Sequence, residues 1–311
     1  MELGCAGLAV PEDRGGAGAS FREAAVVLEE LGRAVAPVPF LGSAVVATSM
    51  LLACSERELL GELASGARTA TLALPFSTAP AAPAPSVRAD GGTLSGTVTS
   101  VADALPADVL LVPVAGAAHA VEVGEGVSRS PVVSLDLTRQ LCDVTFDGAP
   151  GWQVAAGGTA GRALAAALTT GAALLASEQL GVAQWYLETT VEHLKTRYQF
   201  GRPVGSFQGL KHRLADLWVE VSQARAVVRY AAACIAAAHP DTALAQAHCS
   251  AVAVRAAKEC IQMHGGIGFT WEHPAHLHLK RAKSDSIAFG TPDRHRATLA
   301  ALVDLPAAAR E

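Results

Sequence analysis

The chain turns sharply at one stretch, Arg197-Tyr198-Gln199-Phe200-Gly201-Arg202-Pro203-Val204-Gly205-Ser206-Phe207-Gln208. Two glycines and one proline explain the break in the backbone. They do not explain the polar side chains that gather around it, which are Arg197, Gln199, Arg202 and Gln208. A guanidinium binds phosphate oxygens through two parallel N–H bonds, and nearby amides add further donors. The stretch therefore suits a diphosphate, and the alternative is a solvated turn between two helices.

Helical patterns lie on both sides of this turn. Residues 159–197 contain no proline and are rich in Ala and Leu. Between Leu210 and Ala238 apolar residues recur in steps of three and four, at positions 214, 217, 221, 224 and 228, which is the seam of a packed bundle. We expect a third helix from Thr242 to His264, ended by Gly265-Gly266, and shorter helices over 274–288 and 292–303.

The N-terminal half divides into a helical and a β-rich part. Residues 21–32 carry apolar side chains at 24, 27, 28 and 31, one face of a helix, with Gly32 as the expected stop. Residues 43–52 and 56–63 predict further helices. The β-branched runs 69–74, 96–99, 108–114 and 132–135 predict strands of a small barrel or sandwich, with a surface loop from Pro80 to Pro85. We expect an α+β fold: an N-terminal helical domain over 1–66, a small middle β-domain over 67–152 and a C-terminal four-helix bundle over 153–311.

Composition excludes several classes of protein. Of the 311 residues 50% are apolar and 17% charged, with a net charge of −5, so the chain can bury a large core and is not intrinsically disordered. No basic stripe indicates nucleic acid, and no stretch of about 18 uninterrupted apolar residues indicates a membrane span. The six cysteines are scattered, which suits free thiols in a reducing cytosol. The N-terminus also lacks the basic start of a signal peptide, and we expect a cytoplasmic protein.

Two further motifs follow the turn. The first places paired glycines at a helix end, where another group can approach the backbone N–H groups, in Gln262-Met263-His264-Gly265-Gly266-Ile267-Gly268-Phe269-Thr270. No strand precedes it, so it is not the glycine motif of a Rossmann fold. The second has the pattern of an ordinary helix end, Ala282-Lys283-Ser284-Asp285-Ser286-Ile287-Ala288-Phe289-Gly290-Thr291.

In this order and spacing the three motifs resemble the acyl-CoA dehydrogenase family. That family carries R-x-Q-F-G-(R/K)-P-(I/L) followed by F-Q, then Q-x-H-G-G-x-G-(Y/F), and finally A-K-x-x-x-I-(Y)-E-G-T. Its V-P-E-x-x-G-G-x-G is similar to Val10-Pro11-Glu12-Asp13-Arg14-Gly15-Gly16-Ala17-Gly18 near the N-terminus. The resemblance covers essentially the whole chain and implies the same three-part fold.

The resemblance implies FAD as the cofactor and the α,β-dehydrogenation of an acyl-CoA. In such enzymes a carboxylate removes the Cα proton while the flavin takes hydride from Cβ. The R-x-Q and Q-x-H-G-G segments reach the adenine and pyrophosphate half of a FAD seated in a neighbouring subunit. The residues of this chain at the matching positions are Arg197, Gln199, Phe200, Gln208, Gln262, Gly265 and Gly266.

The family's proton acceptor is missing from this sequence. Its usual Glu directly precedes G-T, where Phe289 stands, and its alternative position on the earlier helix falls on Gly171. Two segments surround the flavin ring in the family, T-E-P-x-x-G-S-D and K-x-W-(I/V)-(T/S)-N. The corresponding residues 74–80 and 96–101 match neither. We therefore assign no catalytic residue to this chain.

Other groups are weaker candidates for chemistry. Glu178 and Glu188 lie on the long helix and are typical of interface or surface carboxylates, whereas Asp285 lies one turn before Phe289. The pair His276-x-His278 has no third metal ligand near it in sequence, so no metal site is expected.

Three functional hypotheses follow. The first is an accessory subunit of a heteromeric FAD-dependent acyl-CoA dehydrogenase, an α2β2 heterotetramer of the actinobacterial steroid side-chain type, whose homologous partner supplies the Glu base. The second is a self-sufficient homotetramer with a non-standard base, and the third is a flavin-free scaffold subunit. The resemblance also implies an acyl-CoA substrate, with a steroid side-chain CoA thioester as one candidate, and an electron-transferring flavoprotein as electron acceptor.

Overall fold

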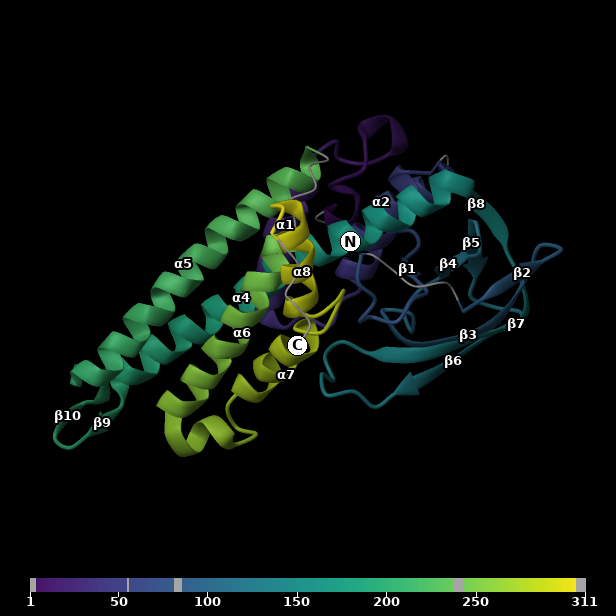
Figure 1. Cartoon of the computed structure of the whole chain (residues 1–311). Helices are drawn as coiled ribbons and strands as arrows, with labels where there is room; N and C mark the ends of the chain where they lie inside the picture. The colour runs from purple at the N-terminus through teal and green to yellow at the C-terminus, as the bar shows by residue number, and fades with distance from the viewer. Residues whose placement is uncertain (1–3, 55, 81–85, 238–242, 306–311) are drawn as a thin grey trace, which may run out of the picture.

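The computed structural model describes residues 4–54, 56–80, 86–237 and 243–305, and helices precede and follow a β-sandwich (Figure 1). The N-terminal helices are η1 (Cys5–Gly7), η2 (Glu12–Arg14), α1 (Phe21–Ala34), the π-helix η3 (Leu41–Ala47), α2 (Thr48–Leu52) and α3 (Glu58–Ser65). The C-terminal helices are α4 (Gly157–Thr196), α5 (Gln208–Ala236), α6 (Ala243–His264), the 3-10 helix η5 (Gly265–Phe269), α7 (Ala275–Asp285) and α8 (Pro292–Leu302). This is the α+β order expected from the sequence.

Helix α1 begins at a capping box and crosses α4 at very short range. The Ser20 hydroxyl and the Glu23 carboxylate satisfy each other's backbone N–H groups at its first turn. Gly32 was expected to end this helix. The helix instead continues to Ala34, so that expectation is wrong. A Cβ on Gly32 would lie 2.2 Å from the Glu178 carbonyl oxygen of α4, so the glycine lets the two backbones touch.

Gly181 on α4 makes the reciprocal contact, and its replacement should loosen the crossing. A Cβ there would lie 1.9 Å from the Glu29 carbonyl oxygen of α1. We expect Gly181→Ala to push the helices apart and to lower the free energy of unfolding by about 1–3 kcal/mol, as overpacking does. Chemical denaturation of the two proteins measures this. Gly161→Ala, on the same helix but with open space around its Cα, should be neutral or stabilising, and equal behaviour of both variants would contradict the close crossing.

Eight of the strands in the described residues form two four-stranded sheets packed face to face. One sheet has the order β1-β4-β5-β8, in which β1 and β4 are parallel and the other pairs antiparallel, and the other has the antiparallel order β2-β3-β7-β6. Their shared core includes Leu110 and Val121 from the first sheet and Val98 and Phe146 from the second. The strands are β1 (Ala70–Leu72), β2 (Arg88–Asp90), β3 (Thr93–Ala102), β4 (Val109–Val114), β5 (Ala117–Glu122), β6 (Val127–Val132), β7 (Leu141–Pro150) and β8 (Trp152–Ala156).

The expected strand over 132–135 is wrong beyond Val132, and its sequence belongs instead to the loop between β6 and β7. Within that loop Asp136 accepts from the Thr138 backbone N–H at 2.9 Å, which turns the chain back on itself. Val133 and Leu135 remain exposed, whereas Asp136 is buried. The loop from Pro80 to Pro85 lies, beyond Pro80 itself, outside the described residues.

The C-terminal helices form the bundle that the periodicity predicted. Leu217, Val221, Ala224 and Val228 of α5 are all buried at 0–2% exposure, which confirms the seam at four of its five positions. Leu214, the fifth, is partly buried and packs against the same core. Helix α4 is long and apolar enough to cross a membrane by composition alone, but 61% of its most apolar window is buried inside the protein, where α4 packs against α1, α5 and α6. At the far tip of the bundle α4 and α5 are joined by β9 (Tyr198–Gln199), β10 (Arg202–Pro203) and η4 (Val204–Ser206) (Figure 1).

Candidate functional site

The turn between α4 and α5 is a tight β-hairpin that presents polar and aromatic side chains to solvent. Phe200 and Gly201 link β9 to β10 with φ of 55° and 75°, the left-handed conformation that a two-residue type I′ turn requires at both positions. The Phe200 side chain is 89% exposed, and Arg197 and Gln199 beside it are exposed as well. A residue that accepts left-handed strain and leaves its ring in water is typical of a contact surface.

Stacked side chains hold this hairpin against the start of α5. The Arg202 guanidinium lies 3.8 Å from the centre of the Phe207 ring, a cation–π contact. The same ring meets Phe200 edge-on at 6.1 Å. Gln208, the first residue of α5, follows directly and is exposed. The hairpin geometry is therefore fixed from both sides.

The end of α6 contributes a second exposed backbone at the same end of the bundle. Gly265 has a φ of 64°, and neither Gly265 nor Gly266 has any atom within 4 Å of the place where a Cβ would stand. Gln262, one turn earlier, is exposed. The two motifs meet because the rings of His193 on α4 and His264 on α6 stack at 4.2 Å. We call Arg197, Gln199, Phe200, Gln208, Gln262, Gly265 and Gly266 the flavin-tail surface.

The two positions that carry the base in the family face each other in this fold. Gly171 lies on α4 and Phe289 lies after α7, and the Phe289 ring covers the Gly171 backbone. A Cβ on Gly171 would stand 2.9 Å from the Phe289 Cζ and 3.0 Å from a methyl group of Val46. An aromatic ring therefore fills the space that a carboxylate from either position would occupy.

The backbone around Phe289 is held firmly in a strained conformation. Its φ is 51°, which costs a bulky residue about 1–2 kcal/mol. The Phe289 N–H donates to the Phe76 carbonyl at 2.8 Å, and the Phe289 carbonyl accepts from His295 Nε2 at 2.9 Å. On the preceding residue, the Ala288 carbonyl accepts from the Gln246 side-chain amide at 2.9 Å. These contacts aim the ring at Gly171.

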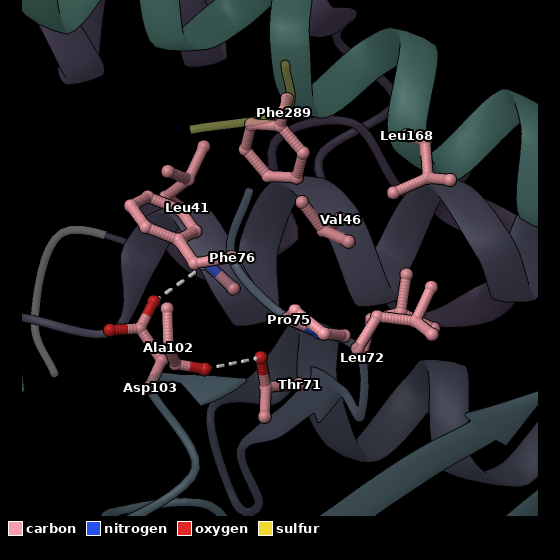
Figure 2. A pocket seen from close by; sticks show the side chains of 12 residues that line it. Leu41, Val46, Thr71, Leu72, Pro75, Phe76, Ala102, Asp103, Leu168 and Phe289 are labelled. Carbon is pink, nitrogen blue, oxygen red and sulfur yellow. Dashed lines mark hydrogen bonds between the residues drawn. The ribbon is translucent and has the colours of Figure 1, made fainter. Parts of the chain in front are cut away.

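Figure 2 shows the cavity beside Phe289, which lies between the N-terminal helices, the sandwich and α4. Its volume is about 30 Å³, room for about two water molecules. Leu74, Pro75 and Phe76, from the first of the two segments compared with the family's flavin-ring pocket, line it. The second segment, 96–101, does not line it, although Ala102 and Asp103 directly after that segment do. Phe76 enters this space and meets Phe289 edge-on at 5.5 Å. The residues present do not fit an isoalloxazine ring, because side chains already fill its place.

A buried network of charges lies behind Phe76. Arg139, from the loop after β6, extends into the bundle, where its guanidinium donates to Glu178 at 2.7 Å and to Asp285 at 2.7 Å. Arg281 of α7 pairs with the same Glu178 and with Asp136. All five side chains are 5% exposed or less. The Arg139 guanidinium also lies 5.1 Å from the centre of the Phe76 ring, so the network supports the ring that fills the flavin pocket.

This network removes Glu178 and Asp285 from the list of free bases. Burial works against ionisation of Glu178, but Arg139 and Arg281 outweigh it and lower the pKa of that carboxyl. Burial and the adjacent charge of Glu178 raise the pKa of Asp285 well above its usual range. One Asp285 oxygen, Oδ2, has no hydrogen-bond partner among the described residues. Neither carboxyl lines the cavity beside Phe289.

The remaining sequence candidates have structural partners. Glu188 pairs with Arg33 of α1 at the surface. His278 stacks on Trp185 at 3.6 Å, and His276 meets Trp271 edge-on at 4.5 Å. Across the described ranges no three metal-binding side chains converge. Cys54, Cys142, Cys234, Cys249 and Cys260 are free thiols.

Comparison with known proteins agrees with this architecture, and the chain belongs to the acyl-CoA dehydrogenase family. Residues 1–66 match the acyl-CoA dehydrogenase N-terminal domain and residues 160–303 match its C-terminal domain. Members of this family are FAD flavoproteins.

Three relatives are informative. Acyl-CoA dehydrogenase IpdE2 of Mycolicibacterium smegmatis is 36% identical over 94% of this chain and 82% of its own length. A variant of the Tcur3481-Tcur3483 steroid ACAD is 30% identical with a TM-score of 0.84, covering 97% of this chain and 86% of that one. The ChsE4-ChsE5 complex of Mycobacterium tuberculosis is 29% identical with a TM-score of 0.82, covering 98% and 87%.

Proposed function

We propose that this chain is the accessory subunit of a heteromeric acyl-CoA dehydrogenase. It lends its flavin-tail surface to a FAD whose ring sits in a homologous partner, and the partner supplies the Glu base. The single observation that carries the proposal is the Phe289 ring seated on Gly171, because it leaves neither family base position able to accept a proton. The cavity of about 30 Å³ beside it supports the same conclusion for the flavin ring.

The flavin-tail surface has the chemistry to hold the other half of a FAD. Arg197 and Gln199 offer exposed N–H donors, and charge-assisted bonds to phosphate are among the strongest hydrogen bonds in proteins. The backbone at Gly265 and Gly266 is open to a close approach. None of these residues lines the cavity beside Phe289, which supports a FAD whose ring is seated in another subunit. When bound, FAD supplies the hydride acceptor, while this chain binds and orients its tail.

The substrate and partners follow from the family. We propose an acyl-CoA substrate and, because one solved relative is described as a steroid ACAD, a steroid side-chain CoA thioester as its candidate class. A second solved relative is a complex of two differently named chains, which supports an α2β2 assembly. Electrons would leave through an electron-transferring flavoprotein, and we place the assembly in the cytoplasm.

Purification of the native protein tests this proposal directly. Mass spectrometry of the assembly should find a second, homologous chain that carries a Glu before its G-T motif, together with FAD and dehydrogenase activity. A native homotetramer with bound FAD and turnover would refute it in favour of a self-sufficient enzyme. An assembly whose flavin content does not depend on this chain would refute it in favour of a scaffold.

Restoring a carboxylate at the family position should not restore catalysis. We expect Phe289→Glu to leave the lone chain inactive, because the flavin ring still has no room. The same change should lower the free energy of unfolding by about 3 kcal/mol, since it removes a buried ring and buries a carboxyl in its place. Activity assays and denaturation curves measure both effects. Phe269→Glu, at a ring that is 77% exposed, is the matched control for stability, and any turnover by the Phe289→Glu chain alone would count against the filled pocket.

A further inference from the structure

The two halves of the flavin-tail surface come from different helices, and a column of histidine rings connects them. His193 lies one turn before Arg197 on α4, and its carbonyl accepts from the Arg197 N–H at 2.9 Å. His264 directly precedes Gly265 at the end of α6. The rings of His193 and His264 stack at 4.2 Å and 24°, and the His273 ring contacts the His264 ring at 4.5 Å with a tilt of 50°.

His264 is the centre of this column and is buried without full hydrogen bonding. Its side chain is 6% exposed. Its Nδ1 lies 2.8 Å from the Cys260 carbonyl oxygen, an acceptor, so the proton of the neutral ring sits on Nδ1. Its Nε2 is therefore a bare acceptor, and it has no partner in the described part of the chain. The neutral ring fits this place, whereas a second proton on Nε2 would leave a buried charge without an acceptor.

Every titratable group packed around the column disfavours added positive charge. Burial, His264 and Arg197 lower the pKa of His193, and burial lowers that of His264. Burial, His264 and His276 lower the pKa of His273. The remaining titratable neighbour, the Cys260 thiol 3.4 Å from His264 Nδ1, is itself kept neutral because burial raises its pKa. No carboxylate of the described residues is among the groups that shift the pKa of any of the three rings.

We propose that the contacting rings of His193, His264 and His273 position the two halves of the flavin-tail surface against each other and release them on protonation. Two imidazolium rings cannot remain stacked in a site without a counter-ion, so the hairpin at Arg197 and the turn at Gly265 separate. This inference rests on the proposed function and adds an acid-sensitive step to the same surface.

The direction of the pH effect follows from the lowered pKa values. A free histidine titrates near pH 6.5, and the folded rings do so at lower pH. The stabilisation from the neutral column is therefore complete above about pH 6.5 and is lost as the pH falls through the lowered pKa values. If one proton is taken up when FAD is released, FAD affinity falls by up to about tenfold for each pH unit below about pH 6.5.

FAD release from the purified heteromer between pH 8 and pH 5, followed by flavin fluorescence, tests the inference. The wild-type assembly should lose FAD on acidification. His193→Phe keeps a stackable ring without a titratable nitrogen, so its profile should be flatter, and His273→Phe provides a second variant of the same kind. His212→Phe, on an exposed position of α5, should retain the wild-type profile.

The outcomes separate this inference from the proposed function. Profiles of the His193→Phe and His273→Phe assemblies that coincide with wild type would overturn the histidine column while leaving the accessory-subunit proposal intact. Retention of FAD at pH 8 after Arg197→Ala would overturn the accessory role itself.

Discussion

Replacing Arg197 with alanine is expected to strip FAD from the assembled enzyme. The side chain is exposed at the end of α4, next to the hairpin. It lies one turn after His193, whose ring stacks on that of His264 directly before Gly265. Loss of one charge-assisted bond to phosphate costs about 1.5–3 kcal/mol, so flavin affinity should fall by about tenfold to about 150-fold. Flavin content and dehydrogenase activity of the heteromer should fall together, because the chemistry needs the flavin.

A matched arginine far from this surface provides the control. Arg296 on α8 is exposed and pairs with Asp293 one turn away, and Arg296→Ala should leave flavin content unchanged. If Arg197→Ala retains its flavin as Arg296→Ala does, this surface does not hold a FAD tail, and the accessory role is contradicted in favour of a scaffold.

Replacing Arg139 with methionine is expected to cause the largest loss of stability. Arg139 joins the loop after β6 to α4 and α7 through Glu178 and Asp285, and all three side chains are buried. Removing one partner of a buried ion pair costs about 3–5 kcal/mol because the other charge stays behind without compensation. The sandwich should also loosen from the bundle, since Phe76 loses its support. Denaturation of the lone chain, monitored without added flavin, measures the effect.

Two further variants show whether charge is the cause. Arg139→Met combined with Glu178→Gln should recover part of the lost stability, because the uncompensated carboxylate is gone. Arg296→Met should change stability little, because Arg296 and its partner Asp293 are exposed, with 55% and 90% of their respective side-chain surfaces accessible. No recovery in the double variant would mean that packing, not the charge network, holds the sandwich in place.

The helices were the most predictable part of this fold. Steps of three and four residues in α5 identified its buried seam because helical periodicity is local and α5 is long. The helix end expected at Gly32 was wrong because this glycine has another role. Its small size allows a contact with α4, which is far away in sequence. The strands were harder. β5 and β7 carry Ala, Asp and Gly among few β-branched residues, and their pairing is set by neighbours that the local sequence does not reveal.

The candidate site, like the fold, has features that the local sequence predicted and features that only the structure reveals. Each base position could be read singly from a motif, so Phe289 and Gly171 both stood out in the sequence. The sequence did not reveal that the Phe289 ring covers the Gly171 backbone, because this contact depends on how α4 packs against the turn after α7. Arg139 and Phe76 were missed altogether. No motif surrounds Arg139, and the mismatched segment around Phe76 signalled only a loss, whereas the structure shows an apolar ring in the flavin's place.

The amount of FAD bound per chain tests the central claim most directly. The claim is that this chain lends contacts to a flavin and houses none. Quantitative absorbance and mass analysis of the native assembly should give one FAD for each pair of this chain and its homologous partner, and none for this chain purified alone. One FAD bound per copy of this chain in a homomer would contradict the account.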